Sequence, residues 1–290
     1  MTGLAWRALL LAFVAVAPSV PAQSRAPSSS VVIMLHPQVG DTLHTRLEQQ
    51  TEVNATSSNG GAVGATTGGT SQVARSVTTA VTIDSRTIVR ASDRSRTTVL
   101  TIVDSAHVTT SDVHAAALIR QAEQSLRGQQ LVLQLAPDGT VLNARDGRGG
   151  AVAREIADAM SAMPAVFPSQ PVRLGETWMR SMPLPAAGPM GTRGSAHVRA
   201  TFRLDSLTQG GETAFLSMRG DIVADSMARG VELSGTVSGA MQVDRTRGWM
   251  ADSRFVVMIR SLVTPPVASG IAPMRFLTRV TQRLRTMDKR

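Results

Sequence analysis

Apolar and polar residues alternate one by one along several long stretches of this chain. Between His197 and Leu204 every second residue is apolar, starting at Val198, and the residues between them are His, Arg and Thr. Successive side chains of a β-strand point to opposite faces of a sheet, so this pattern gives a strand one dry face and one wet face. The alternation predicts a sheet that is buried on one side.

Runs rich in Thr and Val repeat this alternation often enough to predict about ten strands, because β-branched residues favour extended backbone. We expect strands at 43–53, 73–83, 87–90, 97–103, 131–135, 141–142, 178–184, 197–207, 213–224, 231–243 and 249–263, after a short first strand at 31–35. The Asp138-Gly139 dipeptide between two of these runs is typical of a tight hairpin turn.

The segment 274–286 fits two structures. Apolar residues from Phe276 to Met287 recur at spacings of four, four and three, which fits a helix. Alternate positions of the same segment, including Val280 and Gln282, fit a strand equally well. The threonine content and the preceding break at Pro265-Pro266 favour the strand.

Two other stretches have helical spacing. Apolar residues between 115 and 126 fall on one face at spacings of three and four, Ser111 or Asp112 can cap the start, and Gly128 can end the helix. A second helix is expected from about 151 to 163, again with an apolar stripe.

Together these elements predict an α+β fold. We expect a curved, mainly antiparallel sheet of about ten strands, a half-barrel or split barrel, packed on two amphipathic helices. Residues 39–290 would form a single β-rich domain, after a leader at 23–38 that includes the first short strand.

A faint internal repeat leaves a second domain organisation open. Residues 39–43 (VGDTL) resemble residues 174–178 (LGETW), and each opens a series of strands. The domain can therefore also be divided into two pseudo-repeated halves, 39–145 and 171–290, joined by a helix at 150–163.

The first 22 residues have the order of a secretory signal peptide. Arg7 supplies a positive start, Ala8–Ala17 form an apolar run, and Val20-Pro21-Ala22 end in small residues. We expect export from a bacterium, to the periplasm or the exterior, with no transmembrane segment in the mature chain. The chain has no cysteine, so it contains no disulfide and no thiolate metal ligand.

The charge balance is basic, with 30 Lys and Arg against 21 Asp and Glu, a formal net charge of +9. Nucleic-acid binding usually pairs a basic stripe with stacking aromatic residues. This chain has no tyrosine and six phenylalanines, and its arginines are scattered. We expect no nucleic-acid partner, and attraction to an anionic envelope surface is the milder consequence of the charge.

No motif fixes a reaction. Asp104, His107, Asp112 and His114 lie close in sequence, but their spacing matches no established set of metal ligands. A helix cap and solvated turn residues explain the group. We expect no catalytic residue, metal or cofactor, and a non-enzymatic protein. A hydrolase that uses these four residues is the third hypothesis.

The segment Pro171–Trp178 resembles a P-V-x-x-G-E-x-W segment found in uncharacterised exported bacterial β-rich proteins. The order of strands and helices also resembles the lipoprotein-carrier-like half-barrels of the periplasm, in which a curved sheet wraps helices around an apolar cavity. These resemblances imply a half-barrel fold and supply no catalytic residues.

These features lead to a functional hypothesis. We expect the protein to bind a lipid or another apolar or amphiphilic envelope ligand in a cavity between sheet and helices. The expected lining residues are Leu118, Ile119, Met160, Met163, Trp178 and Trp249. The alternative is a structural or protein-interaction module of the envelope whose core is filled.

Overall fold

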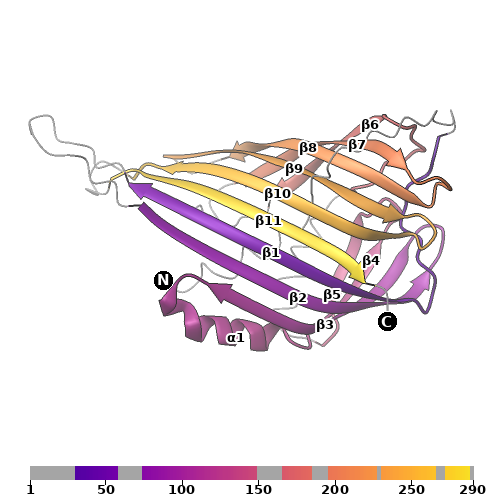
Figure 1. Ribbon diagram of the computed structural model, residues 1–290, viewed down its shortest axis with the longest axis horizontal. Helices are drawn as coiled ribbons and strands as arrows, with labels where there is room; N and C mark the ends of the chain where they lie inside the picture. Colours follow the sequence, from indigo (N-terminus) through magenta and orange to yellow (C-terminus); the bar gives the residue numbers. More distant parts are fainter. Residues whose placement is uncertain are drawn as a thin grey trace, which may run out of the picture.

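The computed structural model describes residues 30–57, 74–148, 165–184, 195–226, 230–265 and 272–287. In this part of the chain, eleven strands form one antiparallel sheet (Figure 1). The strands are β1 (Thr42–Ser57), β2 (Ala74–Ser92), β3 (Thr97–Thr110), β4 (Gln130–Leu135), β5 (Val141–Asp146), β6 (Thr177–Leu184), β7 (Ser195–Leu207), β8 (Thr213–Ser226), β9 (Val231–Asp244), β10 (Trp249–Val263) and β11 (Met274–Met287).

The order across the sheet is β5-β4-β3-β2-β1-β11-β10-β9-β8-β7-β6. The chain therefore forms two meanders, β1–β5 and β6–β11, which pair along β1 and β11. The sheet curls so that its two edges lie behind its central strands (Figure 1), and it is not closed, because β5 and β6 do not pair. The curved, mainly antiparallel sheet is confirmed.

β11 settles the ambiguous segment in favour of a strand. It pairs with β1 from Met287 to Met274 and with β10 from Arg285 to Met274. A strand in this position receives ladder hydrogen bonds on both sides, which a helix could not. Its alternate residues Val280 and Gln282 are buried.

One α-helix lies in the described residues, where we expected two. α1 (Ala116–Leu126) follows a 3-10 turn, and Asp112 caps that turn by accepting a hydrogen bond from the backbone N–H of His114 at 3.0 Å. Gly128 takes the left-handed conformation that ends the helix (φ +75°). The second expected helix, at 151–163, lies outside the described residues, so a fold packed on two helices is not supported.

Two expected strand boundaries are wrong. The segment 31–35 forms only an isolated bridge, between Val31 and Val172. The runs at 73–83 and 87–90 belong to one strand, β2, whose ladder with β3 continues past an irregularity at Asp84/Ser85. The extra residue at this irregularity, Asp104, lies on β3, so β2 itself continues through the polar residues 84–86 in the same parity, with Ile83, Thr87 and Val89 all buried.

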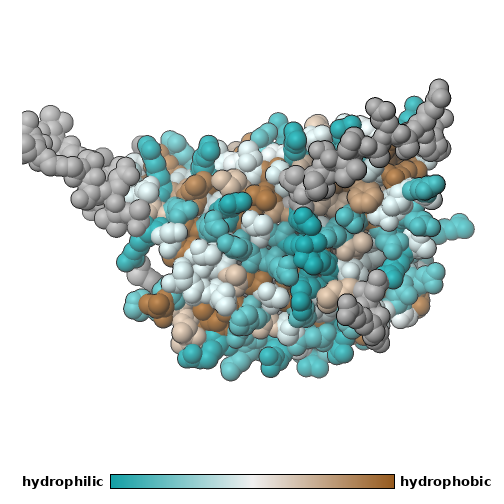
Figure 2. Space-filling view, viewed as in Figure 1, coloured by the Kyte–Doolittle hydropathy of each residue, from teal (hydrophilic) through white to brown (hydrophobic). Residues whose placement is uncertain are grey.

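The concave side of the sheet, here called the inner face, carries the core. The largest cluster covers β6–β11 and includes Phe202, Leu216, Met241 and Phe255. Two smaller clusters cover β2–β5 and the region where α1 buries Leu126 against β2 and β3. The opposite side, the outer face, is mainly hydrophilic, with apolar side chains scattered over it (Figure 2).

At one end of the sheet, here called the tied end, backbone hydrogen bonds connect the turns between strands with the segments that precede β1 and β6. Leu35 N–H donates to Pro137 O at 2.7 Å, and His36 N–H donates to Gly248 O at 2.9 Å. Phe167 N–H donates to Asp138 O at 2.9 Å, and the Phe167 side chain joins the largest core cluster. Within the described residues, no helix has the length and apolar character needed to cross a membrane.

Candidate functional site

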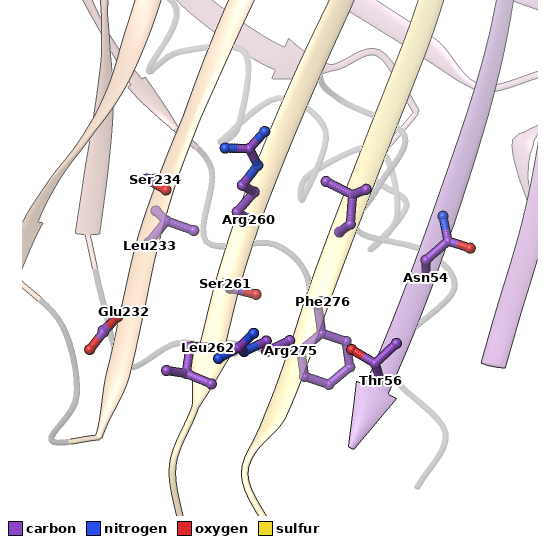
Figure 3. A pocket seen from close by; sticks show the side chains of 11 residues that line it. Asn54, Thr56, Glu232, Leu233, Ser234, Arg260, Ser261, Leu262, Arg275 and Phe276 are labelled. Atoms are coloured by element: carbon purple, nitrogen blue, oxygen red, sulfur yellow. The ribbon is translucent and has the colours of Figure 1, made fainter. Parts of the chain in front are cut away.

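A cavity of about 620 Å³ lies at the end of the strands opposite the tied end (Figure 3). We call this the cavity end. Four neighbouring strands, β1, β11, β10 and β9, supply the lining residues: Asn54, Thr56, Glu232, Leu233, Ser234, Arg260, Ser261, Leu262, Arg275, Phe276 and Leu277.

The strand register arranges most of these residues in two rows across the outer face. Arg260 stands opposite Leu277, and Arg275 stands opposite Leu262. Asn54 and Ser234 extend the first row, and Thr56 and Glu232 extend the second. All eight have the opposite parity to the buried inner residues of the same strands, whereas the other three lining residues, Leu233, Ser261 and Phe276, have the inner parity. The cavity is therefore lined from both sides of the sheet at this end.

The two arginines and two leucines therefore form two adjacent cross-strand pairs, in which each strand contributes one arginine and one leucine. Arg260 and Arg275 occupy one diagonal, for which the spacing between antiparallel strands is roughly 7–8 Å. Figure 3 shows Arg275 extended between Leu262 and Phe276. Both guanidinium groups are exposed, and both leucines are partly buried.

Neither arginine of the cavity forms an ion pair within the described chain. Glu232 is the one carboxylate among the described lining residues. Nearer the middle of the outer face, arginines do have acidic partners: Arg46–Asp84 at 2.7 Å, Arg283–Asp252 at 2.6 Å and Arg285–Glu48 at 3.6 Å.

In the Arg46–Asp84 pair, the carboxylate neutralises the charge of the arginine through direct hydrogen bonds. Two hydrogen bonds from the Arg46 guanidinium, at 2.7 and 3.2 Å, lower the pKa of Asp84, and a hydrogen bond from Ser105 Oγ at 3.0 Å acts in the same direction. Partial burial of Asp84 opposes the shift. The same bond raises the pKa of Arg46, so both groups stay charged and satisfy each other.

A second unusual region is a polar strip on the inner face, formed by Thr45, Gln49, Thr51, Ser253 and Gln282. It lies between the apolar clusters, on the central strands β1, β11 and β10. Gln282 is 2% exposed, and in the described chain neither end of its carboxamide has a hydrogen-bond partner. Such a group loses its hydration without recovering the hydrogen bonds, so it destabilises the fold unless something else contacts it.

Four of the six residues predicted to line a cavity belong to the described part of the chain, and these four are not among the lining residues of this cavity. Trp178 stacks on Phe202 with ring centroids 5.7 Å apart and donates from Nε1 to Val166 O at 3.0 Å. Trp249 packs on the cluster of β2–β5. Leu118 is 38% exposed on α1, with Ile119 partly buried beside it. Met160 and Met163 are outside the described residues.

The structure also separates the group around the two histidines. Asp104 pairs with Arg86 at 3.4 Å, and His107 Nδ1 lies 3.1 Å from Glu123 Oε1. Asp112 caps the turn before α1. No cluster of three or more potential metal ligands occurs among the residues that the structure describes.

The sequence contained a signal for the cavity that the strand analysis missed. Arg-x-Leu occurs at Arg260–Leu262 and again at Arg275–Leu277. A spacing of two places each Arg and Leu on the same face of a strand, and the register of the β10–β11 hairpin sets each Arg opposite the other Leu.

Comparisons with known proteins give a match to a family model over part of the chain. Residues 152–250 match the model of a family of unknown function, DUF6263, and this range contains the segment Pro171–Trp178. No curated protein matches the chain.

Two solved structures are similar at low identity. One, described as lipid–protein interactions in lipovitellin, is 6% identical with a TM-score of 0.40, and the match covers 87% of this chain and 25% of that one. The other, DynF from the dynemicin biosynthesis pathway of Micromonospora chersina, is 10% identical with a TM-score of 0.22, covering 93% and 94%. The chain thus spans about a quarter of the lipovitellin chain.

Proposed function

We propose that this protein is a non-enzymatic binding protein for an apolar or amphiphilic ligand of the bacterial envelope. The observation that carries the proposal is the cavity of about 620 Å³ at the cavity end. Its volume lies within the roughly 300–1,000 Å³ typical of small-molecule sites.

The character of the lining supports an apolar ligand. Leu233, Leu262, Phe276 and Leu277 contribute to it, and Asn54, Thr56 and the serines add neutral polar groups. Sites for small ligands combine such apolar walls with a few polar groups that fix orientation. Each 100 Å² of apolar ligand surface removed from water would contribute roughly 2.5 kcal/mol to binding.

The same lining supports binding rather than catalysis. General acid–base chemistry needs a donor and an acceptor of protons placed around the reacting group. In the part of the chain that the structure describes, the residues lining the cavity include one carboxylate, Glu232, and no histidine. Export is part of the proposal and rests on the signal-peptide pattern of residues 1–22.

Native mass spectrometry of the protein, purified by gentle extraction, tests the proposal. We expect a co-purifying small amphiphile, and we expect the uncharged fluorescent probe N-phenyl-naphthylamine to compete with it. Leu262→Asn and Leu277→Asn should weaken probe binding at least tenfold. Leu142→Asn is the matched control, because Leu142 is 54% exposed on the edge strand β5, away from the cavity.

The opposite outcome is equally specific. Absence of both a bound molecule and probe binding would refute the proposal and favour a structural or interaction module with a filled core. Equal weakening by all three substitutions would place the probe somewhere other than this cavity.

A further inference from the structure

We infer that the ligand carries an acidic head group, a phosphate or a carboxylate, which Arg260 and Arg275 bind together. This inference rests on the proposed function, since it assigns the chemistry of the ligand in the same cavity.

The first step is the placement of the two arginines on one face of neighbouring strands. In Figure 3 the Arg260 side chain extends along β10 away from Arg275, so binding one anion with both requires Arg260 to change rotamer. Arg260 on β10 and Arg275 on β11 share the outer face and lie on one diagonal of the cross-strand pairing. Side chains at such diagonal positions are within reach of each other when they are long. An arginine presents a planar set of donors that matches two oxygens of a carboxylate or phosphate. Two of them on one diagonal can therefore bind one anion from two sides.

The second step is the surplus of positive charge. Glu232 is diagonal to Arg260 on β9, yet the described structure contains no ion pair between them within 4.0 Å. Glu52, in the next row towards the middle of the sheet, stands opposite another arginine, Arg279. The two cavity arginines thus lack the close acidic partner that Arg46, nearer the middle of the same face, has in Asp84.

The third step is the apolar surroundings. Each cavity arginine stands opposite a leucine on the neighbouring strand, Leu277 for Arg260 and Leu262 for Arg275. An alkyl chain lying on these leucines would exclude water from the anion and strengthen its attraction to the guanidinium groups. A free inorganic anion would lack this contribution. The arrangement therefore favours an amphiphile over a small ion.

Calorimetric titration with three probes tests the inference: dodecyl phosphate, monododecyl glycerol ether and inorganic phosphate, the amphiphiles below their micelle concentrations. We expect dodecyl phosphate to bind the wild-type protein at least tenfold more tightly than either of the others. In Arg260→Gln/Arg275→Gln its affinity should fall to that of the uncharged ether, because charge-assisted hydrogen bonds are lost.

Arg254→Gln is the matched control. Arg254 is exposed on the same strand and the same face as Arg260, six residues nearer the tied end, and it does not line the cavity. This variant should retain the affinity of the wild type for dodecyl phosphate. Thermal unfolding should be unchanged in all variants, since exposed arginines without ion pairs contribute little to stability.

The possible failures are distinguishable. If the two amphiphiles bind with equal affinity, the acidic head group is refuted and the cavity remains an apolar site. If Arg254→Gln weakens binding as much as the double variant, the attraction is a property of the whole surface and the inference fails. If inorganic phosphate binds as tightly as dodecyl phosphate, the alkyl chain contributes nothing to binding and the inference that the ligand is an amphiphile is refuted. If no amphiphile binds, both the inference and the proposed function fail.

Discussion

The two ends of the curved sheet are built from different interactions. At the tied end, backbone hydrogen bonds join turns that are far apart in sequence, and Phe167 fills the space between them. At the cavity end, Arg260 and Arg275 stand exposed beside partly buried leucines and form no ion pair with the described residues. The first arrangement uses these hydrogen bonds within the chain and has a cavity of about 630 Å³ beside Pro171, Leu174 and Glu176. The second leaves two guanidinium groups available to another molecule.

This difference separates stability from binding. Substitutions at the tied end should lower the free energy of unfolding, because they remove buried contacts and backbone bonds. Substitutions of exposed residues at the cavity end should change ligand affinity with little effect on unfolding. The following predictions test this separation.

Phe167→Ala should have the largest effect. Phe167 is 4% exposed, and its ring lies against Gly139, where an added Cβ would meet it at 3.6 Å. Removing such a ring leaves a cavity and should lower the free energy of unfolding by about 3–5 kcal/mol. Urea denaturation measures it, with Arg260→Gln as the control at the other end. Equal losses in the two variants would contradict the comparison.

Gly248→Ala should be the next most destabilising. Gly248 has φ +60° and accepts the hydrogen bond from His36, and a Cβ there would come within 2.6 Å of the His36 backbone carbon. Backbone strain and displacement of this segment should cost about 1–3 kcal/mol. Gly40→Ala is the control, because Gly40 also has a positive φ (+92°) but an added Cβ there would meet no atom within 4 Å. This variant therefore measures the backbone strain without the displacement. Thermal unfolding should show a smaller shift for Gly40→Ala.

Gln282→Met should stabilise the protein. Gln282 lies in the polar strip between the two ends, and its buried carboxamide has no partner in the described chain. Methionine has nearly the same shape and removes the unsatisfied polar atoms, so the free energy of unfolding should rise by about 1–3 kcal/mol. A fall in chemical denaturation experiments would show instead that the carboxamide is satisfied by a bound molecule.

Asp84 should give the smallest effect, as a dependence of stability on pH. The hydrogen bonds from Arg46 lower the pKa of Asp84 in the folded state. The stabilisation is therefore present above the ordinary carboxyl pKa and is lost as the pH falls through the lowered value. Unfolding measured from neutral to acidic pH should show a shallower acid decline for Asp84→Asn than for the wild type. Parallel curves would mean that the pair contributes nothing.

Several features were predictable because they are local. The alternation around Phe202 and the cap at Asp112 depend on residues within one element, so the inner-facing side of β7 and the start of the helical region followed from the sequence. The segment 31–35 was wrongly predicted as a strand for a related reason: it has strand propensity, but its backbone partners are Val172, for Val31, and the turn residue Pro137, for Leu35. Propensity cannot reveal whether a neighbouring strand is present.

The candidate site was harder to predict. Large aromatic and methionine side chains were predicted to line a cavity, yet Trp178 stacks on Phe202 and donates a hydrogen bond to Val166 O. The cavity depends on four residues of ordinary types, Arg260, Leu262, Arg275 and Leu277, whose meaning comes from their register. Register depends on the turn that joins two strands, so it cannot be read from either strand alone.

By itself, the sequence determined which side chains of each strand face the core, because a period of two is a local property of extended backbone. Only the tertiary structure decided that β1 pairs with β11, joining residues such as Thr51 and Val280 across most of the chain. That pairing unites two meanders into one sheet, places Gln282 in the buried strip and brings Thr56 beside Arg275. A contact over such a separation depends on the fit of the whole sheet, and no local pattern encodes it.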